Sequence, residues 1–253
     1  MKTSTLTQAV LKLGRGQRRA ALALTVGLVV LLAATIVAVV LVNTGRLRPT
    51  PTNRLQSDYL RAQDRESAAL RAAKSAGRPA ATDPAVISAR ADLVLIEIQA
   101  GQKSAALSRA RGLSRAAPSS AQARSAYAAA LVASGDTQAA LPQFATALRL
   151  LKSGDPELQR SILISYADAL VSDRQPEKAY AQLRQAAAIV PASADLYVRA
   201  AVLATRSQDF KNAAADYLSA LTYDPGNSAA KSGLATLERD HPAAVAAARK
   251  EAL

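Results

Sequence analysis

The sequence of 253 residues contains no cysteine, no tryptophan and one histidine, and aromatic residues make up only 4% of it. The lack of cysteine excludes disulfides, thiol catalysis and cysteine-ligated metal sites. The one histidine, His241, precedes Pro242, which is typical of an exposed residue at a helix break. Phosphate-binding glycine loops and the HExxH and GxSxG patterns are also absent. We therefore predict no enzyme activity, no catalytic residue, no cofactor and no metal.

Alanine dominates what is present, and half of all residues are apolar. Alanine is the best helix former, while the β-branched and aromatic residues that favour strands are sparse outside one segment. The composition therefore predicts an all-α protein.

Residues 20–42 form one long apolar run without any charged side chain. A helix rises about 1.5 Å per residue, so this run is long enough to cross a hydrocarbon core of roughly 30 Å. A cleavable signal peptide has a shorter apolar core of ~7–15 residues that ends at a site of small residues, and no clear site of that kind follows here. We predict one uncleaved transmembrane helix. A signal peptide and a buried core helix are the alternatives.

Residues 1–19 form a basic amino-terminal tail without any acidic residue. Basic residues near a span favour the cytoplasmic side, and the tail carries five of them against four arginines on the far flank. We expect a single-pass protein of the inner or cytoplasmic membrane, with its amino terminus in the cytoplasm and the larger part in the periplasm or an equivalent space. The net charge is +13, but the other basic residues look scattered and no DNA-binding motif occurs, so we expect no nucleic-acid partner.

Residues 43–84 are expected to form a linker and a juxtamembrane helix. Residues 43–53 contain glycine, two prolines and three threonines, which predicts an extended spacer. Residues 54–76 carry alternating charges and end at Gly77 and Pro79, which predicts a solvated helix. This helix packs on the next domain or, as the alternative, binds a partner.

A repeat with a fixed period occupies residues 85–253. Pro191 and Pro225 end similar segments and are thirty-four residues apart, and residues 101–107 match residues 135–141 at the same shift. The repeat has four units, with residues 155–159 as an insertion between the second and the third: residues 87–120, 121–154, 160–193 and 194–227. A fixed period of this size is typical of a solenoid. An alanine-rich helical bundle without repeats is the alternative.

Several motifs stand at equivalent places in these units. Tyr127-Ala128-x-x-Leu131 and Tyr166-Ala167-x-x-Leu170 combine large and small residues at the same spacing, and Gly135-Asp136 is a turn between two helices. With these residues and its period, the sequence resembles the tetratricopeptide repeat (TPR) family. The resemblance implies a right-handed α-solenoid of about four helix pairs with capping helices at the carboxyl end.

The first unit departs from the family pattern. Glu97 stands where a large apolar residue is expected, and Ala110 replaces an aromatic residue. The register of this unit therefore stays open.

The resemblance also implies a concave groove, lined by the first helix of each unit, that binds other proteins. The projected positions are small, apolar and nearly neutral, and the Lys, Arg and Asn residues of a carboxylate clamp are missing. An apolar peptide or partner helix fits such a surface better, and packing between helices is the alternative role for some positions. The projected groove consists of Leu95, Ile98, Gln99, Gln122, Ser125, Ala129, Val132, Ser161, Ile164, Asp168, Val171, Asp195, Val198, Val202 and Thr205.

In layout the chain resembles bacterial membrane-anchored TPR proteins. Such proteins serve cytochrome c maturation, outer-membrane biogenesis, or the assembly of pili and secretion systems. The resemblance implies a scaffold or adaptor that binds partner proteins while a cell-envelope complex assembles. The alternative is a self-associating structural subunit of an envelope complex or filament, and the oligomeric state is left open.

Overall fold

The computed structural model of this protein describes residues 51–151, 155–189 and 192–251. The predicted basic tail, the predicted transmembrane helix and most of the predicted linker lie outside these residues. Within them, no helix combines the length and the apolar character that a membrane span needs. The chain divides into two units, residues 1–56 and 57–253, and the predicted repeat belongs entirely to the second.

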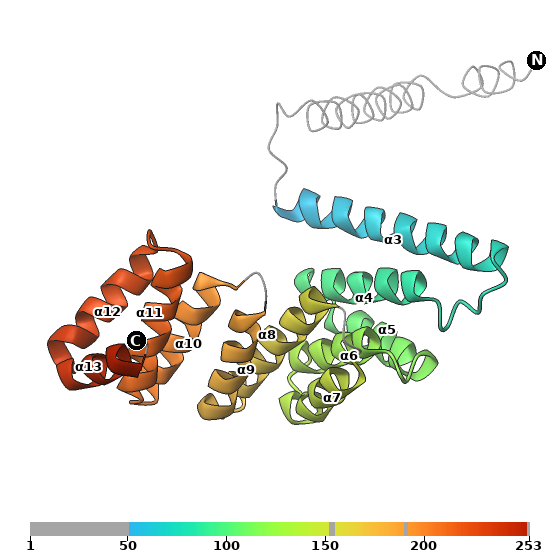
Figure 1. The fold of residues 1–253 in the computed structure, drawn as a ribbon. Coiled ribbons are helices and arrows are strands. Elements are labelled where there is room, and N and C mark those ends of the chain that lie inside the picture. Colours follow the sequence, from blue (N-terminus) through green and yellow to red (C-terminus); the bar gives the residue numbers. More distant parts are fainter. Residues whose placement is uncertain (1–50, 152–154, 190–191, 252–253) are drawn as a thin grey trace, which may run out of the picture. The chain divides into compact units, whose positions relative to one another are not determined.

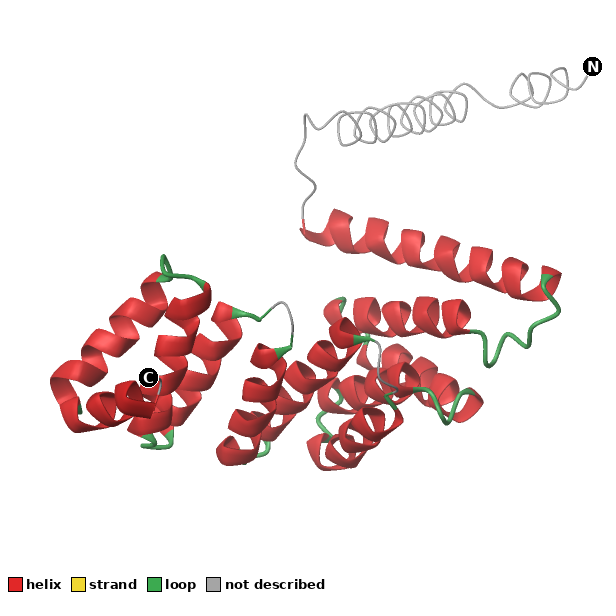
Figure 2. Cartoon of the chain, viewed as in Figure 1, coloured by secondary structure: helices red, strands yellow, loops and turns green. Residues whose placement is uncertain are grey.

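The described residues contain eleven helices and no strand, in agreement with the all-α prediction (Figure 2). In chain order the helices are α3 (Pro51–Ser75), α4 (Pro84–Gln99), α5 (Lys103–Ala116), α6 (Ala121–Ala133), α7 (Thr137–Leu150), α8 (Pro156–Ser172), α9 (Pro176–Ala188), α10 (Ala194–Arg206), α11 (Phe210–Tyr223), α12 (Ser228–Asp240) and α13 (Pro242–Glu251).

From α4 onward the helices form pairs that follow one another along the chain (Figure 1). The pairs are α4–α5, α6–α7, α8–α9, α10–α11 and α12–α13. The second helix of a pair contacts the first helix of the next, as α5 does α6, α7 does α8 and α9 does α10. First helices also contact one another, α4 with α6, α6 with α8 and α10 with α12. The predicted capping segment is the pair α12–α13, and α13 folds back onto α11.

The turns inside the four predicted units are built alike. The second residue after the helix end has a positive φ in each: 74° at Gly101, 92° at Gly135, 59° at Arg174 and 62° at Gln208. In this left-handed conformation, the following backbone N–H reaches back to a carbonyl five residues earlier, as Asp136 N does to Leu131 O at 2.9 Å. Glycine adopts this conformation without strain, but the third and fourth units hold larger residues there.

Proline and capping side chains determine where several helices begin. Asp83, Ser120 and Asp155 precede α4, α6 and α8, and each side chain accepts a hydrogen bond from a backbone N–H of the first turn. Proline is favourable at the first helical position because its missing N–H would have no partner there. For this reason α3 begins at Pro51, and the prediction that the extended spacer continues to residue 53 was wrong.

The predicted insertion at residues 155–159 is present, and most of it belongs to a helix. Helix α8 has 17 residues, whereas α6 and α10 have 13 each. Pro156 starts α8 and Asp155 caps it. Four of the five residues therefore lengthen the first helix of the third pair.

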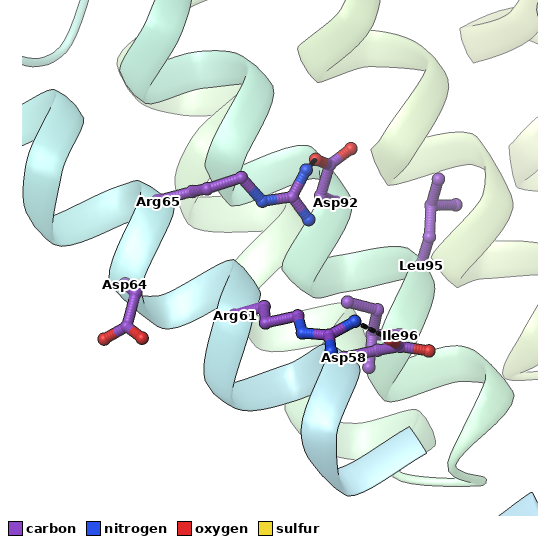
Figure 3. Close-up of a pocket in the computed structure, with 7 residues that line it drawn as sticks. All are labelled: Asp58, Arg61, Asp64, Arg65, Asp92, Leu95 and Ile96. Carbon is purple, nitrogen blue, oxygen red and sulfur yellow. Dashed lines mark ion pairs between the residues drawn. The ribbon is translucent and has the colours of Figure 1, made fainter. Parts of the chain in front are cut away.

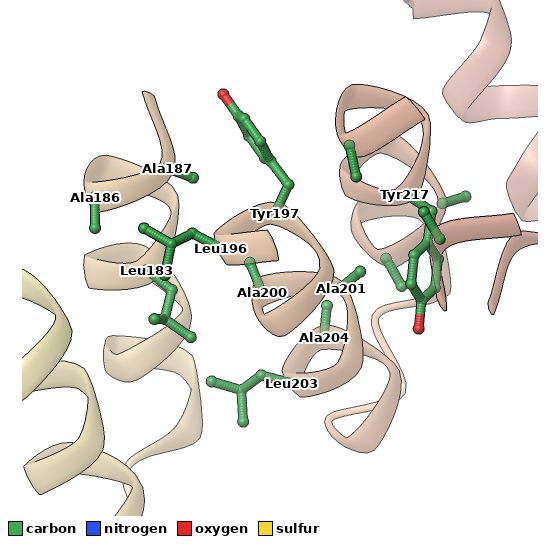
Figure 4. Close-up of a cluster of buried hydrophobic side chains, with 14 of the residues drawn as sticks. Leu183, Ala186, Ala187, Leu196, Tyr197, Ala200, Ala201, Leu203, Ala204 and Tyr217 are labelled. Carbon is green, nitrogen blue, oxygen red and sulfur yellow. The ribbon is translucent and has the colours of Figure 1, made fainter. Parts of the chain in front are cut away.

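The core consists mainly of alanine and leucine, and of a few aromatic rings. Figure 4 shows part of it, with side chains of α9, α10 and α11 lying between the helices. Ala200, Ala201 and Ala204 of α10 are almost completely buried, and such small side chains let neighbouring helices approach closely. Larger side chains fill the remaining space, as Phe144 does in the second pair and Tyr217 in the fourth.

The first pair compensates for its departure from the family pattern. Glu97 is only 2% exposed, and Arg109 of α5 donates to it from Nε at 2.9 Å. This hydrogen bond, and to a lesser degree the charge of Glu97, raises the pKa of the Arg109 guanidinium against the lowering effect of burial. An ion pair between α4 and α5 thus occupies the place where an apolar contact was expected.

Candidate partner-binding surface

The fifteen predicted groove residues all lie on the first helices of the pairs, α4, α6, α8 and α10, and none of them is buried. Seven are exposed: Leu95, Gln99, Ser161, Asp168, Val171, Asp195 and Val202. The other eight are half-buried: Ile98, Gln122, Ser125, Ala129, Val132, Ile164, Val198 and Thr205. The residues are thus accessible and not part of the core. That they bind a partner stays a prediction.

Large apolar side chains are exposed along this row of helices. Leu95 is 44% exposed, Val171 43% and Val202 38%. Within the described residues only Leu60 and Tyr223 are large apolar side chains of comparable exposure. Three of these five side chains therefore belong to the predicted groove. We call the exposed and half-buried side of α4, α6, α8 and α10 that carries the fifteen residues the first-helix face.

Some polar residues of the first-helix face connect neighbouring pairs. Gln122 donates to the hydroxyl of Ser88 at 3.2 Å, and Arg199 donates to Asp168 at 2.5 Å. Such contacts at an exposed surface contribute about 0–1 kcal/mol each, so a partner could replace them at little cost. Sequence reasoning missed them, although the residues stand 34 and 31 positions apart, close to the repeat period.

A hollow of about 780 Å³ opens between α3 and α4 at the Leu95 end of the first-helix face. Figure 3 shows Arg65 of α3 directed at Asp92 of α4, and their charged groups are 3.1 Å apart. Leu95 and Ile96 provide its apolar surface. The hollow is lined by Asp58, Arg61, Asp64, Arg65, Asp92, Leu95 and Ile96.

Ion pairs connect α3 with α4. Besides Arg65 and Asp92, Arg90 donates to Glu66 at 2.8 Å. These ion pairs join the two helices, and the packing of α3 on the next domain stays a prediction. The sequence showed only alternating charges. The missed signal is that each helix carries a basic residue and, one or two positions later, an acidic one: Arg65 and Glu66 on α3, and Arg90 and Asp92 on α4. When the two segments run in opposite directions, each arginine meets the acid of the other helix.

One acidic residue is completely buried between the third and fourth pairs. Asp216 of α11 is 0% exposed, and Arg184 of α9 lies 3.2 Å from its carboxylate. Burial raises the pKa of Asp216 to about 6, although the charge of Arg184 acts in the opposite direction. The contact joins the third pair to the fourth, which indicates a structural role.

His241 lies at the break between α12 and α13, as predicted, but it is half-buried and not exposed as expected. Its ring stacks on that of Phe210, with the centroids 3.5 Å apart. In the part of the chain that the structure describes, no group of three or more His, Cys, Asp or Glu residues is placed to hold a metal ion.

No protein-family model matches this chain, and no curated protein is similar to it in sequence. Several solved structures, TPR proteins among them, are similar in fold. BtubC (BKLC) from P. vanneervenii is 17% identical, with 80% of this chain and 91% of that chain covered and a TM-score of 0.55. The pilF protein of Pseudomonas aeruginosa is 19% identical, with 65% and 72% covered and a TM-score of 0.50.

A third structure, that of YrrB, is described as a TPR protein with an unusual peptide-binding site. It is 15% identical to this chain, with 60% of this chain and 76% of that chain covered, and its TM-score of 0.48 is too low to carry an argument. Identities of this size show the fold alone. The helix pairs of this chain thus have a fold similar to those of BtubC and pilF.

Proposed function

We propose that this chain is a membrane-anchored scaffold that binds partner proteins on the first-helix face. The observation that carries the proposal is the exposure of Leu95, Val171 and Val202 on one row of helices in a fold similar to those of BtubC and pilF. Exposed apolar side chains on three of the four first helices are what a partner protein that covers this face would contact. The almost neutral character of the face suits an apolar peptide or an amphipathic helix of the partner.

The membrane part of the proposal is supported by the uncharged apolar run at residues 20–42. We place the amino terminus in the cytoplasm and the helix pairs in the periplasm or an equivalent space, since the tail of residues 1–19 is purely basic. A scaffold held there would bring partner proteins together during assembly of a cell-envelope complex. Its role is binding and not catalysis.

Crosslinking in cells tests the binding surface. A photo-crosslinking residue at Val171 or Val202 should capture a defined partner, whereas the same residue at Ala181 should not. Ala181 is a suitable control because it is exposed on α9, a second helix. Val171→Glu with Val202→Glu should abolish capture while the helical circular dichroism stays unchanged, and Ala181→Glu should leave capture intact.

Capture that persists in the Val171→Glu, Val202→Glu variant would refute binding on the first-helix face. The mass of the complex separates the scaffold from a self-associating subunit. A detergent-solubilised protein that is monomeric until the partner is added supports the scaffold. Large homo-oligomers that dissociate in the double variant would assign the same surface to a second copy of this chain. Protease accessibility in intact cells tests the orientation.

A further inference from the structure

The net positive charge of the helix pairs is concentrated on one helix. Residues 156–251 contain eleven Lys and Arg and eleven Asp and Glu, so the net charge of α8 to α13 and their turns is zero. Helix α5, by contrast, contains four basic residues and no acidic one: Lys103, Arg109, Arg111 and Arg115. The expectation that basic residues are scattered therefore holds for α8 to α13 but not for α5.

Two adjoining hollows, of about 610 Å³ and about 650 Å³, lie on the surface of α5 and α6, and both are lined by Arg111 and Arg115. We call them together the α5 basic groove. Arg124 of α6 lines the first hollow and Lys103 the second. The serine hydroxyls of Ser104 and Ser108 also line the second hollow, and no acidic residue lines either one.

The charges of the α5 basic groove are not neutralised by acidic side chains. Glu97 pairs with Arg109, which does not line the groove. In the described residues, no ion pair includes Lys103, Arg111, Arg115 or Arg124. An uncompensated cluster of four cations attracts an anionic partner.

Arg124 is held in place by neutral groups. Its Nε donates to the carbonyl oxygen of Pro118 at 3.2 Å, and its Nη1 donates to the side-chain oxygen of Gln143 at 3.1 Å. These bonds orient the guanidinium without cancelling its charge. An oriented guanidinium loses less freedom on binding and suits a carboxylate, which it can contact through two N–H groups.

We propose that the α5 basic groove binds an extended, acidic peptide segment of a partner protein. The concave shape favours a peptide over a bilayer surface, because a flat layer of headgroups would not reach side chains that line a hollow. Gly112 lines the second hollow, and the space beside its Cα is open, because an added Cβ would meet no atom within 4 Å. A bound peptide could therefore approach the backbone of α5 closely at this position. The groove is lined mainly by α5 and in part by α6, and none of the fifteen residues that define the first-helix face lines it.

The test uses the full-length protein in an uncharged detergent and a fluorescent peptide of ten consecutive glutamates. Arg111→Gln with Arg115→Gln should weaken peptide binding on the order of tenfold, because charged hydrogen bonds to carboxylates are strong. Arg206→Gln with Lys231→Gln removes the same charge at exposed positions of α10 and α12 and should leave binding unchanged. Higher salt should weaken binding to the unmodified protein.

A second readout excludes binding to the basic tail of residues 1–19. A photo-crosslinking residue at Ser108 should capture the peptide, and one at Ala181 should not. Equal affinity of the two double variants, or no crosslink from Ser108, would overturn the proposal. The proposal would also be overturned if Arg111→Gln with Arg115→Gln weakened binding to phosphatidylglycerol vesicles or to a single-stranded oligonucleotide but not to the peptide. The Val171→Glu, Val202→Glu variant should bind the peptide normally, which separates this test from that of the first-helix face.

Discussion

Gly233 of α12 is a point where one methyl group should decide whether the end of the stack is stable. A Cβ added to Gly233 would lie 2.2 Å from Cζ of Tyr217, 2.5 Å from its Cε1 and 2.6 Å from its hydroxyl oxygen. Tyr217 belongs to α11 and is only 6% exposed. The flat ring thus rests directly on the backbone of α12, and only glycine leaves room for it.

The effect of Gly233→Ala results from two opposing contributions. Alanine is about 1 kcal/mol more favourable than glycine inside a helix. Carbon atoms pack at roughly 3.5–4.0 Å, so the ring would have to move by more than about 1 Å within a packed core. Overpacking of this kind costs about 1–3 kcal/mol or more. We expect the clash to prevail and Gly233→Ala to lower the free energy of unfolding by about 1–2 kcal/mol.

Gly112→Ala is the matched control. Gly112 also lies inside a helix, but an added Cβ would meet no atom within 4 Å. Here only the helix preference acts, so this variant should be stabilised by up to about 1 kcal/mol. Thermal and urea unfolding of the full-length protein, followed by circular dichroism, measures both variants. Hydrogen exchange of α11 and α12 shows whether the loss is confined to this end of the stack.

A double-mutant cycle tests the cause. Tyr217→Leu removes all three atoms that the new Cβ would meet, so Gly233→Ala should become stabilising in that background. The reasoning is refuted if Gly233→Ala stabilises the protein as much as Gly112→Ala does. It is also refuted if Gly233→Ala destabilises equally with and without the Tyr217 ring, because the cost would then not arise from the clash.

Three further predictions concern turns and buried charges. Arg174→Gly and Gln208→Gly should each raise the free energy of unfolding by about 0.5–1 kcal/mol, since both positions have a positive φ, and chemical denaturation measures this. Burial raises the pKa of Asp216 to about 6 from an ordinary 3.8, so the folded state binds the proton more tightly and stability should fall by roughly 3 kcal/mol as pH rises from about 4 to above 6. Asp216→Asn should remove this fall in melting curves recorded across that range. Arg109→Ala should cost about 2–4 kcal/mol because it leaves Glu97 charged and buried, whereas Glu97→Leu should cost less, and equal losses in urea titrations would contradict the pairing.

Local sequence features predicted the helices well because the physical causes of helix boundaries are local. A capping side chain acts within its own first turn, as Asp83 and Ser120 do. Proline acts through its own ring and missing N–H, which explains why α8 begins at Pro156. The repeat period located the insertion at residues 155–159 but not its conformation, because the period marks equivalent residues and not how far a helix extends beyond them.

The accessible side of the first helices was also predictable. The resemblance to the TPR family implied the fifteen groove positions, and none of these residues became part of the core. Their internal contacts were not predicted, since Gln122 and Ser88 meet only because successive pairs stack.

The sequence by itself determined that the described chain is all-helical, how long its helical units are and which side of the first helices stays accessible. Only the tertiary structure decided that Glu97 pairs with Arg109, that Tyr217 rests on Gly233 and that four cations line one groove on α5 and α6. The physical reason is distance. Caps, turns and periodicity act between residues a few positions apart, whereas charge pairing, packing and hollows depend on which remote residues the stacking of helices brings within a few ångströms.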